Sequence, residues 1–133
     1  MIGLDTNIII RYLTQDDPEQ ARAVNALFET ILTPQTPGLI TLITLVEVVW
    51  VLESCYEQPK AAIEAVIHGL LTTRKLQVEN AAAVYLALES FSHGTADFSD
   101  ALIVASARQM GCESIVTFDR KAQSVGMTLL PTV

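Results

Sequence analysis

Apolar residues occur along the chain in two patterns, short runs and longer segments with helical spacing. The short runs predict β-strands at Ile2–Leu4, Leu39–Ile43, Leu76–Val78, Ser114–Phe118 and Thr128–Leu130. In the longer segments apolar residues recur every three or four positions, which predicts helices at about 8–13, 18–31, 44–55, 59–71, 80–91 and 100–109. Because strands alternate with helices, the pattern predicts an α/β sandwich, in which helices cover a parallel sheet.

Several polar residues and glycines mark the ends of these elements. Asp17 precedes Pro18, and proline is favoured at the first position of a helix. Thr44 and Asn80 can accept hydrogen bonds from the first N–H groups of the helices that follow them. Gly111 fits the C-terminal cap of the helix at 100–109, and Gly126 fits a turn before the last strand.

The composition is that of a globular protein rather than a disordered segment. Half of the 133 residues are hydrophobic and 17% are charged, so we expect residues 1–133 to form a single domain with a buried core. The sequence contains neither an apolar run long enough to span a membrane nor a signal peptide, and Cys55 and Cys112 lie far apart without metal-type spacing. We therefore expect a cytoplasmic protein in which both thiols are reduced and buried.

The net charge of −7 argues against a nucleic-acid-binding surface of the usual basic kind. An acidic protein can still act on nucleic acid if several of its carboxylates hold divalent cations, because the cations neutralise both the protein and the incoming phosphates. The same charge favours association with a basic protein partner.

Glu47 is the acid in the least favourable sequence context. Its neighbours from Leu45 to Leu52 are apolar on nearly every side of the predicted helix, so we expect this helix, and Glu47 with it, to be largely buried. A buried unpaired charge costs several kcal/mol, as an order of magnitude, so Glu47 must be paired, protonated or bound to a cation. A structural salt bridge is the alternative to a metal site.

Four further acids lie at the ends of predicted elements. Asp5 and Asp119 each follow an apolar strand, and ligands of parallel sheets bind just outside the carboxyl ends of the strands. Asp97 and Asp100 lie at the start of the predicted helix that continues to Gln109. Each of these acids has an ordinary explanation as a helix cap or a turn residue, and Asp97 in particular is either a ligand or a cap.

Together, these acids point to one metal site. Asp5, Glu47, Asp100 and Asp119 all lie at strand ends or on apolar helices, and such positions can converge at one edge of a sheet. Uncompensated, the carboxylates would repel one another, so the group implies a divalent cation, and ligands that offer only oxygen suit Mg²⁺ or Mn²⁺. Metal ions held by carboxylates activate water and stabilise the leaving oxygen in phosphodiester hydrolysis.

At these residues the sequence resembles the PIN-domain family, and within it the VapC-type toxins. The matching segments are Leu4–Asn7, Leu45–Leu52, Asp97–Ile103 and Thr117–Asp119, which occur in the family's order and spacing and cover essentially the whole chain. Each segment alone is a weak signal, but the four in order are fairly specific.

The resemblance implies a fold, a site and a function. The fold would be PIN-like, an α/β/α sandwich with a central parallel sheet of four to five short strands. The metal-binding and catalytic acids would be Asp5, Glu47, Asp100 and Asp119, with Asp97 as an accessory acid and with Asn7 and Thr117 as supporting polar residues. The activity would be Mg²⁺- or Mn²⁺-dependent cleavage of single-stranded RNA by a homodimer, with the protein acting as the toxin of a toxin–antitoxin pair. A cognate antitoxin with a basic C-terminal segment would inhibit it.

Other functions agree less well with the sequence. A haloacid-dehalogenase phosphatase needs a second Asp where Asn7 stands, and a phospho-acceptor receiver domain has no role for Glu47. His68 and His93 are expected at the surface, and the chain contains no Ser-His-Asp set or glycine-rich phosphate loop. The remaining alternative is a PIN-like module that binds protein or RNA without catalysis, and the intact set of acids argues against it. The sequence does not identify the RNA, the number of metal ions or the antitoxin.

Overall fold

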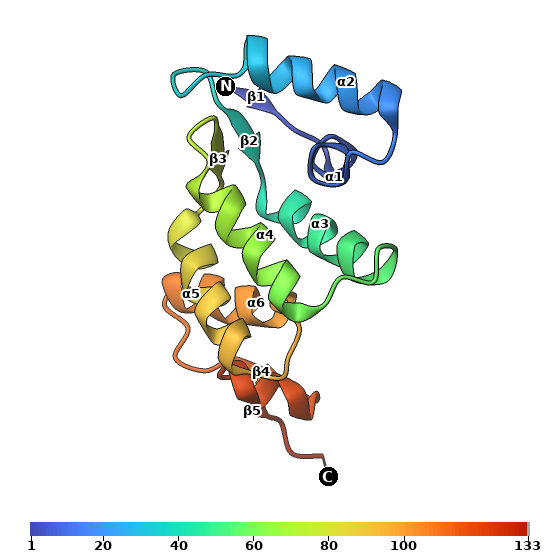
Figure 1. The fold of residues 1–133 in the computed structure, drawn as a ribbon. Helices are drawn as coiled ribbons and strands as arrows, with labels where there is room; N and C mark the ends of the chain where they lie inside the picture. The colour runs from blue at the N-terminus through green and yellow to red at the C-terminus, as the bar shows by residue number, and fades with distance from the viewer. Residues whose placement is uncertain (133) are drawn as a thin grey trace. The chain divides into compact units, whose positions relative to one another are not determined.

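The computed structural model describes residues 1–132 and has the α/β character that the sequence predicts (Figure 1). The Cα positions divide the chain into two compact units, Met1–Glu79 and the segment that begins at Asn80. No cis peptide bond occurs in the described residues. Each unit contains its own parallel strand pairs and its own buried apolar residues.

Unit 1 is built on a three-stranded parallel sheet. Its elements in chain order are β1 (Ile2–Gly3), α1 (Thr6–Thr14), α2 (Pro18–Ala26), the π-helical turn η1 (Leu27–Ile31), β2 (Gly38–Ile40), α3 (Leu42–Ser54), α4 (Lys60–Thr72) and β3 (Leu76–Val78). The strand order is β1-β2-β3, and Gly38 pairs with Ile2 on one side and with Leu76 on the other. A side chain at Gly38 would meet Leu4 Cδ1 at 2.5 Å, so only glycine lets β2 approach the residues around β1 this closely.

The core of unit 1 comes from one face of each helix. Its fully buried side chains are Ile9, Leu32, Ile40, Leu45, Val48, Ile63 and Ile67. Tyr12 and Phe28 stack with their ring centroids 3.8 Å apart, which fixes α1 against the end of α2. The helical spacing of apolar residues therefore identified most of the buried side chains of these helices. Ile31, at the end of the helix predicted at 18–31, is an exception and is 53% exposed.

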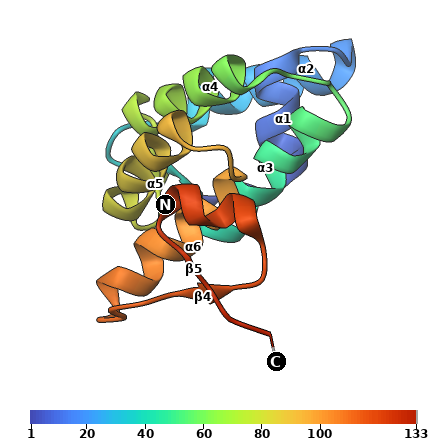
Figure 2. The same ribbon diagram turned by 90° about the horizontal axis from the view of Figure 1, so that it is seen from below.

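Unit 2 consists of two packed helices and a small parallel strand pair. It contains α5 (Ala81–His93), α6 (Phe98–Gln109), β4 (Val116–Thr117), the 3₁₀ helix η2 (Arg120–Val125) and β5 (Thr128–Leu129). Figure 2 shows β4 and β5 running side by side, in agreement with their parallel pairing. Phe91 of α5 and Phe98 of α6 pack edge to face, with centroids 5.8 Å apart.

The predicted elements are confirmed, with differences at their ends. Five parallel strands are present, but they form a three-stranded and a two-stranded sheet within the described residues. The strand predicted at Leu39–Ile43 ends at Ile40 because Thr41 caps α3 by accepting a hydrogen bond from Thr44 N–H at 3.2 Å. Thr44 was predicted as that cap, and this was wrong. The prediction for Ser114–Phe118 was also too long, since only Val116 and Thr117 pair.

Helix boundaries in unit 2 follow their caps. Asn80 Oδ1 accepts from Ala83 N–H at 3.4 Å, as predicted for the cap of α5. The helix continues through His93, past its predicted end at Phe91, and α6 begins at Phe98 rather than at Asp100. Gly111 and Gly126 have positive φ, as expected of the C-terminal cap and the turn.

The cysteines differ from the prediction in one respect. Both are free, as expected, but both are exposed rather than buried. Cys55 caps the C-terminal end of α3, and Cys112 follows the turn at Gly111, so neither lies on a helix face that packs against the core. His68 is exposed, as predicted. Among the described residues, no helix has the length and apolar content needed to cross a membrane.

Candidate metal centre

Asp5 lies between β1 and α1, at the N-cap position of α1. Its Oδ1 accepts a hydrogen bond from Thr6 N–H at 2.7 Å, so the capping role considered for this residue is present in the structure. The carboxylate is exposed, and Asn7 in the first turn of α1 is exposed as well. A carboxylate has about four lone-pair positions, so one capping bond leaves Asp5 able to bind a cation.

Thr6 connects the start of α1 to α3. Its hydroxyl donates to Glu47 Oε2 at 2.6 Å, across 41 positions of sequence. This contact places Glu47 beside the residue that follows Asp5, so two of the candidate acids are brought to one place in unit 1. Sequence reasoning missed Thr6, and its only signal was its position next to Asp5 in the Leu4–Asn7 segment.

Glu47 is exposed, so the prediction that it is buried was wrong. The helix α3 is apolar on all sides, but only the side that carries Leu45, Val48, Val49 and Leu52 is buried. Glu47 lies on the opposite side, one turn from Ile43 and one turn from Trp50, which are 75% and 63% exposed. The cost of burying a charge therefore gives no argument for a cation at Glu47. The prediction of Glu47 as a metal ligand depends on its contact with Thr6 and on its place in the Leu45–Leu52 segment.

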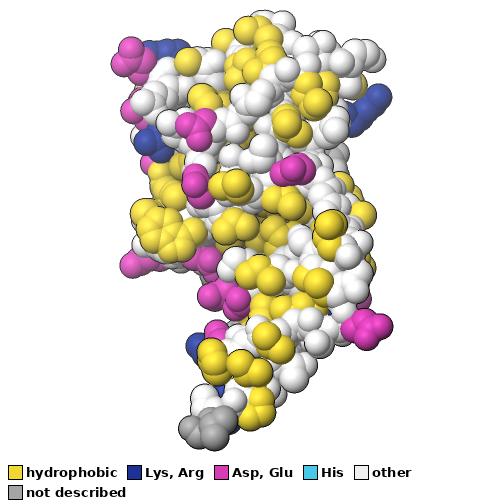
Figure 3. Space-filling model, turned by 180° about the vertical axis from the view of Figure 1, so that it is seen from behind, with side chains coloured by type: hydrophobic (Ala, Val, Ile, Leu, Met, Phe, Trp, Pro, Cys, Tyr) yellow, Lys and Arg dark blue, Asp and Glu magenta, His cyan; other side chains and the backbone are white. Residues whose placement is uncertain are grey.

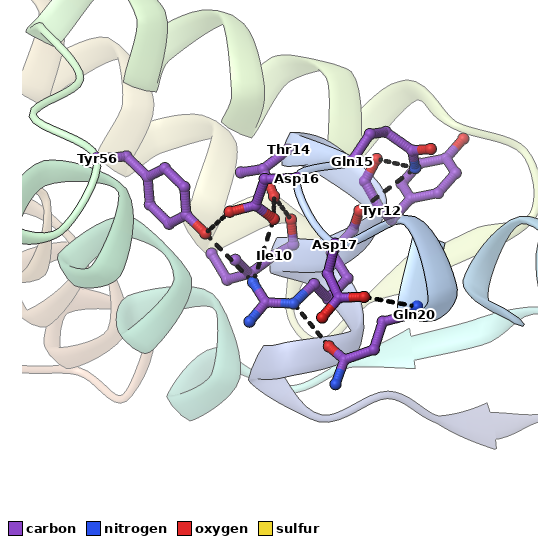
Figure 4. Close-up of polar contacts among 9 residues, drawn as sticks. Ile10, Tyr12, Thr14, Gln15, Asp16, Asp17, Gln20 and Tyr56 are labelled. Atoms are coloured by element: carbon purple, nitrogen blue, oxygen red, sulfur yellow. Dashed lines mark hydrogen bonds and ion pairs between the residues drawn. The ribbon is translucent and has the colours of Figure 1, made fainter. Parts of the chain in front are cut away.

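Arg11, the basic residue of α1, contacts residues other than the candidate acids. Arg11 Nη1 lies 3.4 Å from Asp16 Oδ1, and Arg11 Nε donates to Gln20 Oε1 at 2.7 Å (Figure 4). Tyr56 donates its hydroxyl to Asp16 Oδ2 at 2.7 Å, and Thr14 donates to Asp16 Oδ1 at 2.8 Å. These hydrogen bonds, with that of Tyr56 the largest cause, lower the pKa of Asp16. These contacts join α1 and α2 to Tyr56, which follows α3, and they give Arg11 a structural role.

Unit 2 gathers three acids around the start of α6. Asp97 occupies the N-cap position, but in the part of the chain that the structure describes its carboxylate accepts no capping hydrogen bond. Asp100 lies in the first turn of α6 and is half-buried, while Asp97 and Asp119 are exposed. Partial burial is the largest cause that raises the pKa of Asp100, followed by the charges of Asp97 and then Asp119.

Asp119 follows β4 and begins η2. Its Oδ1 accepts from Lys121 N–H at 2.9 Å, and its own N–H donates to Thr117 Oγ1 at 3.0 Å. Thr117 therefore holds the backbone at Asp119 through its hydroxyl, while its supporting role in a metal site stays a prediction. The position of Asp119 at the carboxyl end of a strand agrees with the sequence prediction.

The donor chemistry of these residues fits a hard divalent cation. Every candidate ligand offers carboxylate oxygens, which suit Mg²⁺ and Mn²⁺. Partial burial, followed by the like charges of Asp97 and Asp119, raises the pKa of Asp100, and a cation would offset these effects. Among residues 1–132, however, no three His, Cys, Asp or Glu side chains lie close enough together to hold a metal ion. The chain thus supplies the ligand types and two local groups of acids, but not a preassembled cage.

Comparison with known proteins extends these observations. The family model of the PIN domain matches residues 2–126, which include all five candidate acids. The VapC ribonuclease of Aquifex aeolicus (strain VF5) is 24% identical over 123 residues, covering 92% of this chain and 90% of that protein. No solved structure matches the chain significantly.

Proposed function

Because the chain belongs to the PIN domain family, we propose that it is an endoribonuclease that depends on Mg²⁺ or Mn²⁺ and acts as the toxin of a toxin–antitoxin pair. The observation that carries this proposal is the match over residues 2–126, a range that includes the five acids predicted from the sequence as metal ligands. The similarity to a VapC ribonuclease supports the choice of RNA as substrate and of a protein inhibitor as partner.

The proposed ligands of the metal are Asp5, Glu47, Asp97, Asp100 and Asp119. When bound, the metal supplies an activated water and stabilises charge on the phosphate and the leaving oxygen. Asp100 is suited to hold the cation because its carboxylate is partly desolvated and faces two like charges, which a cation would neutralise. Thr6 and Thr117 hold Glu47 and the backbone of Asp119 by the hydrogen bonds described above. Asn7 is proposed as a polar support near Asp5.

The partners follow from the same proposal. An acidic chain with 15 Asp and Glu against 8 Lys and Arg favours an antitoxin whose C-terminal segment is basic. Arg of that segment would pair with the site carboxylates in bidentate fashion. We also propose that the protein acts in the cytoplasm and that it forms a homodimer. The large apolar side chains that reach the surface support the dimer (Figure 3). Light scattering that gives a monomer throughout the micromolar range would refute the dimer.

Expression in cells tests the proposed toxin. We expect the wild-type protein to arrest growth, and co-expression of the product of a small adjacent gene to relieve the arrest. Asp5→Ala should be harmless without that partner, because it removes a proposed metal ligand. Glu29→Ala, which changes an exposed acid outside the motifs, is the matched control and should arrest growth like the wild type. Arrest by Asp5→Ala at wild-type strength would remove the acidic site as the source of toxicity.

A PIN-like interaction module without catalysis is the second candidate. Metal titration separates it from the nuclease, since a nuclease should gain thermal stability from Mn²⁺ by binding the ion in its folded state. If Mn²⁺ leaves the melting temperature unchanged, and Asp5→Asn behaves like the wild type, the interaction module becomes the better assignment.

A further inference from the structure

A groove of about 400 Å³ lies between α5 and α6 on the surface of unit 2. Three buried apolar residues of α6 line it, Ala101, Val104 and Ala105. Two of the three are alanines, whose short side chains leave the space between the helices open. The Asn80 side chain donates to Gln109 Oε1 at 2.6 Å and so joins the start of α5 to the end of α6 beside the groove.

Leu86 lines the groove from the side of α5, and it is 59% exposed. A single exposed leucine is ordinary on a protein surface. Here it borders an apolar groove, so the two features form one apolar surface, of the kind at which proteins bind one another.

Two opposite charges line the same groove, Glu89 from α5 and Arg108 from α6. Both residues are exposed, and among residues 1–132 neither side chain has an ion-pair or hydrogen-bond partner. A Cβ at Gly126 would lie 2.7 Å from Arg108 Nη2, so the guanidinium lies against the turn at Gly126. The groove therefore offers one acid and one base that do not neutralise each other.

We propose that this groove is the interface of a two-fold symmetric dimer, in which Glu89 of each copy pairs with the partner's Arg108. The inference rests on the homodimer of the proposed function and names its interface. In such an interface, if one residue contacts a second on the partner, the second also contacts the first. An axis that passes through the groove between Glu89 and Arg108 therefore forms two ion pairs. Because Leu86 lies one turn from Glu89, the same axis brings it toward the partner's turn of α6 that carries Val104 and Ala105.

The charges of the groove favour a second copy over a different protein. A basic segment, such as that of the proposed antitoxin, would pair with Glu89 but would be repelled by Arg108. An acidic segment would meet the reverse arrangement. A second copy of this chain supplies both signs at the spacing that the groove requires, because it carries the same two residues.

The direct test is the dimer dissociation constant of the purified full-length protein, measured by sedimentation equilibrium. We expect Glu89→Lys and Arg108→Glu each to weaken the dimer by on the order of tenfold or more, because each variant places like charges together at both contacts. An equal mixture of the two variants should form a heterodimer with close to wild-type affinity, since both contacts then join opposite charges.

Two matched controls separate the groove from general effects. Glu113→Lys changes the net charge as Glu89→Lys does, at an exposed position of unit 2 that does not line the groove, and should dimerise like the wild type. Leu86→Ser should weaken the dimer, whereas Ile103→Ser should not, because Ile103 is 52% exposed on α6 but does not line the groove. Circular dichroism establishes that each variant is folded. If Arg108→Glu is not folded, Glu89→Lys and Leu86→Ser decide.

Two results would overturn the inference while the dimer itself stands. Wild-type dissociation constants in Glu89→Lys, Arg108→Glu and Leu86→Ser would place the interface elsewhere on the chain. Weakening in both charge variants without recovery in their mixture would mean that Glu89 and Arg108 do not pair across the interface. A monomeric wild type would instead refute the proposed homodimer, and this inference with it, whereas the proposed ribonuclease activity is tested separately by RNA cleavage.

Discussion

Asp100 differs from the other candidate acids in its surroundings. It is half-buried at the start of α6, and both its partial burial and the charges of Asp97 and Asp119 raise its pKa. In the metal-free protein its charged form is therefore less favourable in the folded state than in the unfolded chain. Asp16 shows the opposite case, because hydrogen bonds from Tyr56 and Thr14, with a smaller effect of Arg11, lower its pKa.

These two carboxylates predict pH effects of opposite sign. A raised folded-state pKa means that stability is lost as pH rises through that pKa, so Asp100→Asn should melt at a higher temperature than the wild type at neutral pH in chelator. The difference should shrink as pH falls from the folded-state pKa toward 3.8, where the unfolded chain also takes up the proton. With Mn²⁺ present the stabilising effect of the substitution should disappear.

Asp16→Asn is the control for this experiment. A lowered folded-state pKa means that the charge stabilises the protein above the unfolded-state value of 3.8 and that this contribution is lost as pH falls through the folded-state pKa. Asp16→Asn should therefore melt at a lower temperature than the wild type at neutral pH, with or without metal. If Asp100→Asn is also destabilised in chelator at neutral pH, the acids of unit 2 do not repel one another as described.

At the same scale, the sequence identified the chemistry of the site residues better than their exposure. The five candidate acids were predicted from their positions at the ends of elements and on an apolar helix, and their role as metal ligands stays a prediction. The exposure of Glu47 was not found, because an apolar sequence around a helix does not say which side packs. Thr6 was missed because its partner Glu47 lies 41 positions away, and local patterns contain no information on such contacts.

At the scale of elements, α3 leaves one apolar side unpacked. Ile43, Glu47 and Trp50 share this exposed side, and residues three or four apart on a helix have Cβ atoms about 5–6 Å from each other. Trp50 is the only tryptophan of the sequence, so tryptophan fluorescence comes from this one position, one helical turn from Glu47.

This arrangement gives a test of Glu47 as a ligand. Mn²⁺ is paramagnetic and should quench Trp50 fluorescence if it binds at Glu47, and an excess of Mg²⁺ should reverse the quenching by competition. Glu47→Gln should abolish the saturable part of the quenching, while Glu29→Gln, in the same unit, should not. Saturable quenching that persists in Glu47→Gln would place the ion elsewhere.

The ends of helices and strands could be predicted where residues close in sequence determine them. Asn80 caps the helix that it was predicted to cap, and Asp17 caps the helix predicted to begin at Pro18, because capping needs only a polar side chain and the N–H groups of the next turn. Strand lengths were less predictable, because a strand ends where its neighbour stops pairing, and β4 pairs with β5 over two residues only. Thr41 and Thr44 had equal chemistry as caps of α3, and only the pairing of β2 decides between them.

At the scale of the whole molecule, the PIN-domain match spans residues 2–126 and so extends over most of both compact units. Unit 1 carries Asp5 and Glu47, and unit 2 carries Asp97, Asp100 and Asp119. We propose that residues 1–133 act as one domain and that both groups of acids are required for activity. The α/β class and the parallel strands were predictable from the alternation of elements, but the division of strands into two sheets was not, because hydrophobic runs do not specify their partners.

The most direct test of the account is cleavage of single-stranded RNA by purified protein, with the new RNA ends determined by sequencing. The wild type should cleave with Mg²⁺ or Mn²⁺ and stop when chelator removes the ion. Asp5→Asn and Asp100→Asn, one from each unit, should each lower the rate by roughly a hundredfold or more, because both are proposed metal ligands. Glu29→Gln should cleave like the wild type. Cleavage that persists in chelator, or at wild-type rate in either Asp variant, would contradict the assignment of a metal-dependent ribonuclease to these acids.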